Sequence, residues 1–451
     1  MLISAIQQID LVAQAANAYL YKVMIDHPMH ISLSDFAARQ PVTVQAVYTP
    51  EGGVWKARAM FLTDDNGCVD VATQAPLSGS YHDADAMGLF WSMERDTSEE
   101  SSHDNRVTLT AWQSEQRQAV VTIERLLVAP GVMRQRVREQ GLYGTLMLPP
   151  GEGPHPGMLV LGGSGGGIEA AAFAAQLFAS HGYAALALAY FHYEGLPMKL
   201  HSIPLEYFET AIQWMQAHKS IQKDHIGVYG RSRGGELALL LGATFSSLKT
   251  VVALVPGAIV FQGMSGTEGT GIVSQGMSET RGPESHSSWS FHGQDLPYVP
   301  IRFTAESGQA MRQAMQEHTA FALSPSILHS LEHADAETIA QATIPVEKIQ
   351  GPVLLVSGQD DQMWPSSLLS DMVIKRLVQH QFSHAYKHLA YPDAGHQITF
   401  PYQPAINAGD QGPFTFAMGG KAQSQAAANQ DSWTQILAFL ARTLSHENSN
   451  I

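Results

Sequence analysis

The stretch HIGVYGRSRGGELALLLG, residues 225–242, joins an apolar strand-like run to an apolar helix-like run through a G-x-S-x-G pentapeptide centred on Ser232. A chain that turns this sharply needs small residues two positions either side of the serine, because bulkier ones collide with neighbouring backbone. The turn holds the hydroxyl above a sheet edge, at a helix N-terminus whose dipole stabilises developing negative charge. The stretch predicts Ser232 as a nucleophile. An ordinary glycine-rich turn between strand and helix is the alternative.

Strand-like runs, turns and helix-like runs alternate on both sides of this stretch, from residue 141 onward. MLVL (158–161) precedes the glycine-rich GGSGGG (162–167). AALALAYF (184–191) is apolar throughout, as expected of a strand buried on both faces. LEYFETAIQWMQAH (205–218) has helical spacing of its apolar residues. This alternation predicts a mostly parallel, doubly wound sheet with helices on both faces.

A nucleophilic serine requires a base, and the base requires a carboxylate that orients it. After the serine, the α/β-hydrolase order is an acid following a later strand and then a histidine. The run GPVLLVSGQDD ends in Asp360 and Asp361, and KHLAYPDAGH ends in His396. We predict Asp361 as the acid because it lies further past the strand, which leaves Asp360 as a turn residue. Asp393 is too close to His396 in sequence to reach the far side of its ring.

The chain order therefore predicts an α/β-hydrolase fold with Ser232, Asp361 and His396 as catalytic residues. Backbone N–H groups after the first central strand must then stabilise the oxyanion. We assign one donor to Gly163 or Ser164 in GGSGGG and the other to the amide of Arg233. A phosphate-binding loop is the competing interpretation. However, the run lacks the G-K-[ST] ending and the G-x-G-x-x-G spacing that phosphate loops use.

Several weaker features leave alternatives open. The Gly- and Ser-rich stretch Gln262–Gln294 fits neither helix nor strand period and predicts a long loop. We predict Trp289 in it and Tyr298 beyond it as substrate-binding residues; the alternative is that they only pack the loop. Arg231 and Arg233, which flank the serine, have two interpretations. They attract an anionic substrate, or they are ordinary exposed side chains beside a turn.

One histidine pair has the spacing of a metal site. His329 and His333 flank Glu332 at the i, i+4 spacing that permits metal binding on a helix. Solvated surface histidines are the commoner explanation, and no third ligand is identifiable from the sequence. We therefore predict no metal and no cofactor.

The N-terminal part has a different sequence pattern: short runs in which apolar and polar residues alternate, separated by turn residues. VTVQAVYT (42–49) precedes a Pro- and Gly-containing turn, and VVTIERLLV (120–128) precedes Pro130-Gly131. Such runs predict an all-β, immunoglobulin-like sandwich. We therefore expect three segments: a helical extension over residues 1–28, the β-sandwich over residues 29–140 and the catalytic domain over residues 141–451.

Composition excludes several classes of protein. The 451 residues include 26 Lys and Arg against 41 Asp and Glu, a net charge of −15, which disfavours nucleic acid or an anionic membrane surface as partner. A single cysteine, Cys68, excludes an internal disulfide framework and a thiolate metal cluster. No apolar run is long enough to span a bilayer, and the N-terminus lacks the basic region of a signal peptide. Cytoplasmic residence is the default expectation, and the oligomeric state stays open.

Taken together, these runs resemble the acyl-CoA thioesterase and bile acid-CoA:amino acid N-acyltransferase family. The likeness rests on LGGSGGGIEAAAFAAQLFASHGYAALALAYFHYEGLP, GVYGRSRGGELALLLG, SGQDDQMWPS and YPDAGHQI, and on VWKARAMFLTDDNGCVDV in the N-terminal half. It implies a triad at Ser232, Asp361 and His396 and acyl-CoA substrates without a metal. Acyltransferases of the family carry Cys at the nucleophile position. The serine here favours transfer to water.

The sequence therefore predicts a serine hydrolase that cleaves acyl-CoA thioesters to the free acid and coenzyme A. The chain offers no obvious basic site for the coenzyme A phosphates, so a serine carboxylesterase or amidase acting on another small acyl substrate is the first alternative. The second is a non-catalytic binding protein with an idle triad.

Overall fold

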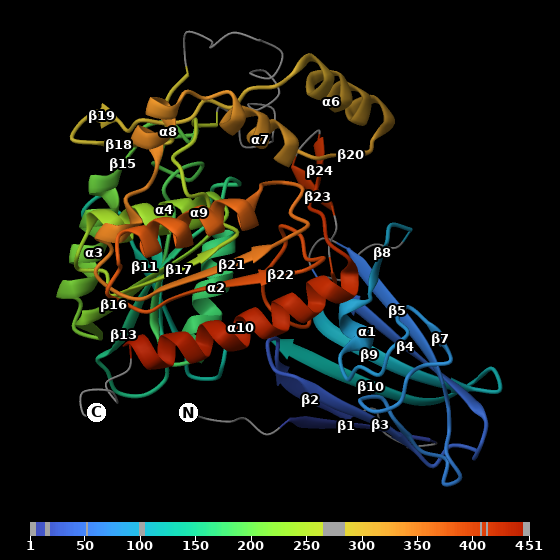
Figure 1. Ribbon diagram of the computed structural model, residues 1–451. Helices are drawn as coiled ribbons and strands as arrows, with labels where there is room; N and C mark the ends of the chain where they lie inside the picture. Colours follow the sequence, from blue (N-terminus) through green and yellow to red (C-terminus); the bar gives the residue numbers. More distant parts are fainter. Residues whose placement is uncertain are drawn as a thin grey trace. The chain divides into compact units, whose positions relative to one another are not determined.

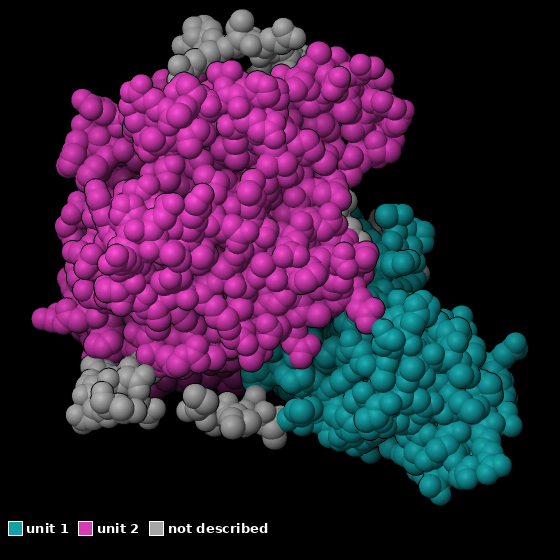
Figure 2. Space-filling view, in the orientation of Figure 1, with its two compact units in different colours: residues 1–127, 399–405 teal, residues 128–398, 406–451 magenta. Residues whose placement is uncertain are grey.

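The computed structural model describes residues 6–13, 19–50, 53–98, 104–264, 285–405, 408–411 and 414–444. The chain forms two compact units (Figure 2). Unit 1 comprises Met1–Leu127 and Thr399–Ala405, and unit 2 comprises Val128–Ile398 and Ile406–Ile451. No helix in the described part of the chain is long and apolar enough to cross a membrane.

Unit 1 contains two β-sheets, in the orders β1-β3-β6 and β2-β10-β9-β4-β5-β7, with β8 paired to β5 (Figure 1). The period-two pattern of the sequence is visible in β9, where Val107, Leu109 and Ala111 are buried and Thr108 and Thr110 are only partly so. The elements of this unit are β1 Gln7–Val12, β2 Tyr19–Met24, β3 Met29–Ser34, β4 Pro41–Thr49, β5 Val54–Leu62, β6 Val69–Asp70, β7 Ser78–Gly79, α1 Gly88–Trp91, β8 Glu94–Asp96, β9 Asp104–Gln113 and β10 Gln116–Leu126.

The prediction of a helical extension over residues 1–28 is wrong for the described residues. Strand β1 pairs in parallel with β3, and β2 pairs in parallel with β10. The reason is local: Ile9 and Leu11 are fully buried and alternate with less buried neighbours, which is the period of a strand with one buried face.

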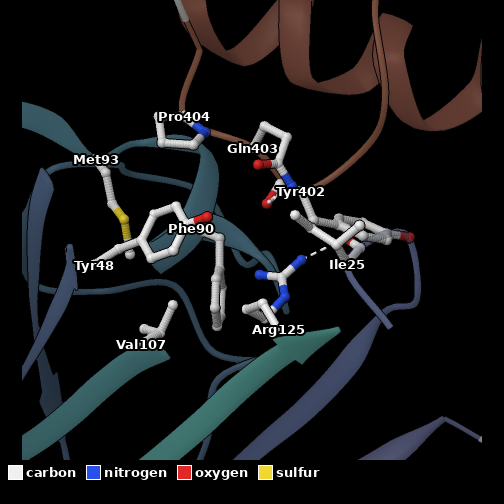
Figure 3. Close-up of a pocket in the computed structure, with 9 residues that line it drawn as sticks. All are labelled: Ile25, Tyr48, Phe90, Met93, Val107, Arg125, Tyr402, Gln403 and Pro404. Carbon is white, nitrogen blue, oxygen red and sulfur yellow. Dashed lines mark hydrogen bonds between the residues drawn. The ribbon is translucent and has the colours of Figure 1, made fainter. Parts of the chain in front are cut away.

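A small pocket inside unit 1 surrounds the buried guanidinium of Arg125 (Figure 3). This group lies 5.0 Å from the centroid of the Phe90 ring and donates a hydrogen bond to the Ile25 carbonyl. Burial lowers the pKa of Arg125 to about 10, so the side chain stays charged at neutral pH. Tyr402, which the chain reaches shortly after His396, also lines this pocket. The full lining is Ile25, Tyr48, Phe90, Met93, Val107, Arg125, Tyr402, Gln403 and Pro404.

Unit 2 is built on an eight-stranded sheet in the order β11-β12-β14-β13-β16-β17-β21-β22. β11, β12 and β14 pair antiparallel, and the pairs from β14 onward are parallel. Every residue of β14 and β21 is buried, as the continuous apolar runs predict. The strands are β11 Met133–Val137, β12 Gly144–Leu148, β13 His155–Leu161, β14 Ala184–Leu188, β16 Ile221–Arg231, β17 Thr250–Leu254, β21 Val353–Gly358 and β22 Tyr386–Tyr391.

Helices cover both faces of this sheet (Figure 1). On one face α2 meets α10, where the rings of Phe178 and Trp433 lie 5.3 Å apart. α3, α4 and α9 cover the other face, and α4 and α9 both contact the short helix η1. The predicted α/β-hydrolase fold is thereby confirmed. These helices are α2 Glu169–Ser180, α3 Leu205–Ala217, α4 Arg233–Thr244, η1 Val346–Lys348, α9 Ser366–Gln379 and α10 Ala422–Leu444.

Between β17 and β21 the chain forms an insertion beyond the sheet, seen above it in Figure 1. Residues 265–284, most of the predicted Gln262–Gln294 loop, lie outside the described residues. The end of that loop forms β18 and the start of a short hairpin with β19. The insertion and its neighbours contain β15 Ile203–Pro204, β18 Trp289–Phe291, β19 Gln294–Asp295, α6 Ala305–Glu317, β20 Ala320–Phe321, α7 Ser324–Glu332 and α8 Ala336–Ala342, with β23 Ala408–Gln411 and β24 Phe414–Ala417 pairing beside β20.

The two units divide at Leu127/Val128. The sequence predicts a boundary at 140/141, where short alternating runs give way to strand-turn-helix alternation. The difference arises because β11, before the predicted boundary, pairs with β12 over its whole length and so belongs to the large sheet. Its exposed Met133, Arg134, Gln135 and Arg136 give it no apolar signature in the sequence.

We expect Phe178→Ala to lower the free energy of unfolding of unit 2 by about 3–5 kcal/mol, because it leaves a cavity between Tyr229 and Trp433. Urea unfolding measures this change. Leu368→Ala, at a side chain 47% exposed on α9, is the control and should change little. Equal midpoints for the two variants would contradict the packing described for α2 and α10.

Candidate active site

Ser232 occupies a strained turn between β16 and α4. Its φ of 57° and ψ of −123° are rare for a residue with a Cβ, a strain of about 1–3 kcal/mol. The flanking glycines make the turn possible. A Cβ on Gly230 would lie 1.8 Å from the Gly234 carbonyl oxygen, and one on Gly234 would lie 2.3 Å from the Gly162 oxygen. The elbow predicted from G-x-S-x-G is therefore present.

The three predicted catalytic side chains form one hydrogen-bonded row. Nε2 of His396 lies 3.1 Å from Oγ of Ser232, and Nδ1 lies 2.8 Å from Oδ2 of Asp361. Since a carboxylate only accepts, Nδ1 carries the proton and the Nε2 lone pair faces the serine hydroxyl. All three residues are buried, with exposed fractions of 8% for Ser232, 8% for Asp361 and 4% for His396. This arrangement suits His396 to act as a general base toward Ser232.

The Asp361 carboxylate is fixed from several sides. Oδ1 accepts the backbone N–H groups of Met363 at 3.1 Å and Trp364 at 2.9 Å. The hydroxyl of Ser366, the first residue of α9, donates to Oδ2 at 2.6 Å. These donors hold the charged carboxylate in place and thereby orient the imidazole. Ser366 was not among the residues predicted from the sequence, although its position five residues after the acid, at the start of a helix, was a usable signal.

The two rival aspartates have other partners. Oδ2 of Asp360 accepts the backbone N–H of Gly420 at 2.8 Å. The carboxylate of Asp393 lies 3.1 Å from Nζ of Lys421 and is largely exposed. Of the three aspartates, Asp361 is the one whose Oδ2 lies 2.8 Å from Nδ1 of His396.

Arg231 braces the histidine loop instead of facing a substrate. Its Nη2 donates to the His396 carbonyl oxygen at 2.8 Å and to Oε1 of Gln397 at 2.7 Å, and its Nε donates to the Ile398 oxygen at 3.2 Å. Burial lowers the pKa of this guanidinium, and its interactions with Tyr229 and Asp361 oppose only part of that fall. The His396 backbone is held from a further direction, since its N–H donates to the Met418 oxygen at 2.7 Å.

The predicted oxyanion donors gather beside Ser232. A Cβ built on Gly163 would lie 3.2 Å from Cβ of Ser232 and 3.8 Å from its Oγ, so the glycine-rich loop directly adjoins the nucleophile. Ser164 and Arg233 line the same pocket as Ser232. Arg233 is the first residue of α4, where backbone N–H groups have no acceptor within the helix.

The side chain of Arg233, by contrast, belongs to a buried ion pair. Nη1 donates to Oε2 of Glu236 at 2.6 Å, and Nη2 donates to the Gln262 oxygen at 2.8 Å and to the Ser288 hydroxyl. Burial raises the pKa of the fully buried Glu236, and the charge of Arg233 opposes that rise. This pair fastens the nucleophile helix to the insertion, so neither flanking arginine presents an exposed charge to an anionic substrate.

Trp289 and Tyr298, the predicted substrate-binding residues, lie elsewhere. Trp289 is fully buried, and its Nε1–H donates to Oε1 of Glu236 at 2.8 Å. A buried indole N–H requires such an acceptor, which the sequence does not reveal. The hydroxyl of Tyr298 donates to the Ser285 carbonyl oxygen at 2.8 Å. Neither residue is among those that line the pocket at Ser232.

That pocket is mostly apolar and holds about 340 Å³ of empty space, part of it open to solvent. Its apolar residues come from the insertion and from the loop after Asp361. These residues were not predicted from the sequence, although Met363 and Trp364 lie only two and three positions after the predicted acid. The lining is Ser164, Ser232, Arg233, Met264, Ile301, Leu323, Met363 and Trp364.

Both halves of the chain match a known family. Residues 203–446 match the family described as BAAT / Acyl-CoA thioester hydrolase C terminal. Residues 26–139 match the one described as Acyl-CoA thioester hydrolase/BAAT N-terminal region. The chain belongs to the acyl-CoA thioester hydrolase/BAAT family. The resemblance inferred from the sequence is therefore confirmed.

The relatives that this chain matches include a protein named as an amino acid N-acyltransferase and one named as a thioesterase. Mouse acyl-coenzyme A amino acid N-acyltransferase 1 is 32% identical over 463 residues, covering 98% of this chain and 100% of the relative. Mouse peroxisomal succinyl-coenzyme A thioesterase is 31% identical over 438 residues, covering 94% of this chain and 95% of the relative. Among solved structures, a dienelactone hydrolase-like phosphotriesterase from metagenomic libraries matches with a TM-score of 0.41 at 16% identity, covering 70% of this chain and 100% of that chain.

A second Ser–His–Asp row joins two strands of the large sheet to a helix, with Ser357 on β21, His388 on β22 and Asp371 on α9. Ser357 Oγ is 2.7 Å from Nε2 of His388, whose Nδ1 is 3.0 Å from Oδ1 of Asp371. Ser357 is fully buried in β21, where no acyl group reaches it, and burial lowers the pKa of His388. Residue types and hydrogen bonds alone therefore do not identify a nucleophile; access and the strained elbow distinguish Ser232.

We expect Ser366→Ala to lower kcat roughly tenfold to hundredfold, because Asp361 loses one charge-assisted hydrogen bond. The matched control is Ser370→Ala on the same helix. Ser370 is equally buried, and its Oγ has no hydrogen-bond partner among the described residues. Steady-state kinetics with an acyl ester or thioester that the wild-type protein hydrolyses gives kcat for the two variants. Equal kcat values in the two folded variants would show that Ser366 does not position the acid.

Proposed function

We propose that the protein hydrolyses acyl-CoA thioesters through a covalent acyl intermediate on Ser232. The observation that carries the proposal is the 3.1 Å contact between Nε2 of His396 and Oγ of Ser232, at a serine held on a strained elbow beside an apolar pocket. Membership of a family with named acyl-CoA thioesterases supports the thioester as substrate.

In the first half-reaction, Oγ of Ser232 attacks the thioester carbonyl carbon while Nε2 of His396 takes the hydroxyl proton. Asp361 stabilises the resulting imidazolium. The carbonyl oxygen becomes an oxyanion, which the N–H groups of Arg233 and of Gly163 or Ser164 stabilise. Collapse of this intermediate breaks the carbon–sulfur bond. The sulfur receives the proton from His396, and coenzyme A leaves as the thiol.

In the second half-reaction, His396 takes a proton from water, and the hydroxide oxygen attacks the acyl carbon on Ser232. The ester bond to Oγ then breaks, and the proton returns from His396 to Oγ. The products are the free acid and the regenerated serine. No redox step is involved, and each proton that His396 accepts is donated again within the same half-reaction.

The pocket supports an apolar acyl group. Met264, Ile301 and Leu323 approach Ser232 from the insertion, and Met363 and Trp364 approach from the acid loop. Burial of acyl methylene groups there contributes about 0.8 kcal/mol for each. The polar side chains that line the pocket are Ser164, Ser232 and Arg233, of which the last is neutralised by Glu236.

The nucleophile favours hydrolysis over transfer to an amine. An acyl group held on cysteine is a thioester and passes readily to an amine, whereas an oxygen ester on Ser232 is less reactive toward amines and goes to water. Relatives of this chain include both thioesterases and N-acyltransferases, and the proposal assigns the choice between the two outcomes to the nucleophile at position 232.

We expect Ser232→Ala to lower kcat/KM for acyl-CoA at least about a thousandfold, because nucleophile and base act as a unit. Ser357→Ala, which removes the buried serine of the second row, is the matched control and should keep turnover. The assay follows release of coenzyme A across an acyl series from short to long, beside p-nitrophenyl esters of the same acids.

Undiminished activity of a folded Ser232→Ala variant would end the proposal. Turnover of esters without turnover of thioesters would retain the nucleophile but assign the protein as a carboxylesterase. Failure of wild-type Ser232 to react with a fluorophosphonate would favour a binding protein with an idle triad.

We expect Ser232→Cys to raise the ratio of amide to free acid when glycine or taurine is present with an acyl-CoA. The physical reason is the greater reactivity of a thioester toward amines. Mass spectrometry of the products gives the ratio for the variant and for wild type. A ratio that is the same in both would show that the nucleophile atom does not decide between water and amine in this protein.

A further inference from the structure

Three metal-ligating side chains gather at the C-terminal end of α7, apart from the residues that line the catalytic pocket. They are His329, Glu332 and His333, and each can place one ligand atom within 4.8 Å of the others. His329 is partly buried, and the other two are exposed. The helix brings them together, because residues three and four positions apart share one face.

The ring of His333 is already oriented as a metal ligand requires. Its Nδ1 lies 2.9 Å from the His329 carbonyl oxygen. A carbonyl only accepts hydrogen bonds, so Nδ1 carries the proton, and the lone pair of the neutral ring is on Nε2. Metal-bound histidines typically donate their second ring N–H to a carbonyl or carboxylate in this way. The ring of His329 lies beside it, with centroids 3.9 Å apart.

The sequence led us to predict no metal, but from this geometry we propose that His329, Glu332 and His333 bind a divalent transition-metal cation, with Zn²⁺ as the best fit. Two imidazoles and one carboxylate are a zinc ligand set, and water completes the tetrahedron. Ligand atoms in such a site lie about 3.3 Å apart, given metal–ligand distances near 2.0 Å. The ligand atoms, which lie within 4.8 Å of one another, therefore move closer together when the metal binds.

The carboxylate of the neighbouring Asp335 is not part of the group of three ligand atoms that lie within 4.8 Å of one another, and it has partners of its own. Asp335 caps α8, and its two oxygens accept the backbone N–H and the hydroxyl of Thr338 at 2.7 and 2.8 Å. The metal therefore has three protein ligands, all within one helical turn. This set restrains the last turn of α7.

Metal binding there also bears on the pocket at Ser232. Leu323, which precedes α7, lines that pocket, and the N–H of Ser324 donates to the Gln362 oxygen at 2.9 Å, next to Asp361. One end of α7 thus contacts the acid loop, and the other carries the metal ligands. A cation that binds the folded helix stabilises the protein by mass action.

Isothermal titration calorimetry of untagged, chelator-treated and desalted protein with ZnCl₂ tests the proposal. We expect wild type to bind one more equivalent of Zn²⁺ than His329→Asn/His333→Asn, and its melting temperature to rise with zinc by more than that of the variant. The matched control is His380→Asn/His384→Asn, a pair with the same sequence spacing in which His380 is the C-cap of α9 and His384 lies beyond the helix. It should bind as wild type does.

Equal zinc stoichiometry and affinity in wild type and in His329→Asn/His333→Asn would overturn the proposal. If that variant fails to fold, Glu332→Gln decides, because this exposed side chain can be changed without disturbing the core. We expect Glu332→Gln to weaken zinc binding at least about tenfold. Loss of a residue that only hydrogen-bonds to a metal ligand already costs about that much affinity, so loss of a direct ligand should cost no less. Unchanged affinity in Glu332→Gln would equally overturn the three-ligand site. Catalytic turnover does not enter this test, so its result is independent of the proposed function.

Discussion

The contact on which the site depends is the close approach of backbone around Ser232. The elbow brings Gly230 so near Gly234, and Gly234 so near Gly162, that only hydrogen fits at either position. This approach sets the serine at a φ of 57° and joins the nucleophile to the glycine-rich loop that holds the predicted oxyanion donors. A strained turn persists only when its surroundings determine it, and here β16, α4 and the loop after β13 all do so.

Around this elbow, buried hydrogen-bonding and charged side chains hold the catalytic residues and the nucleophile helix in position. Arg231 holds the loop of His396. Arg233 and Glu236 pair with each other within α4, and their further hydrogen bonds with the Gln262 carbonyl and the Trp289 indole hold α4 against the insertion. Breaking a buried pair by removing one partner is costly, because the other charge is left unpaired. The two arginines that flank the nucleophile therefore act on the protein itself, and the pocket they leave beside Ser232 is apolar on most of its surface.

The fold and the row of Ser232, Asp361 and His396 were predictable because chain order and strand-turn-helix context are local signals that survive in one sequence. The features that the sequence did not reveal depend on contacts between residues or strands that are not neighbours in the local pattern. Trp289 appears as a loop aromatic, yet its indole is buried against Glu236. The exposed strand β11 carries no apolar pattern, and its place in the large sheet follows only from pairing with β12. The short strand β1 was predicted as helix because an alternation as short as that of Ile9 and Leu11 does not separate a strand from a helix in the sequence alone; the pairing with β3 does.

The central claim is that Ser232 carries the acyl group between the two half-reactions. Rapid quench of the wild-type protein with an acyl-CoA, followed by peptide mass spectrometry, tests it most directly. The account predicts a transient peptide that contains Ser232 and is heavier by the mass of the acyl group, formed with the burst of coenzyme A and lost as free acid appears. An acyl group on a different residue, or a coenzyme A burst with Ser232 unmodified throughout, would contradict the account.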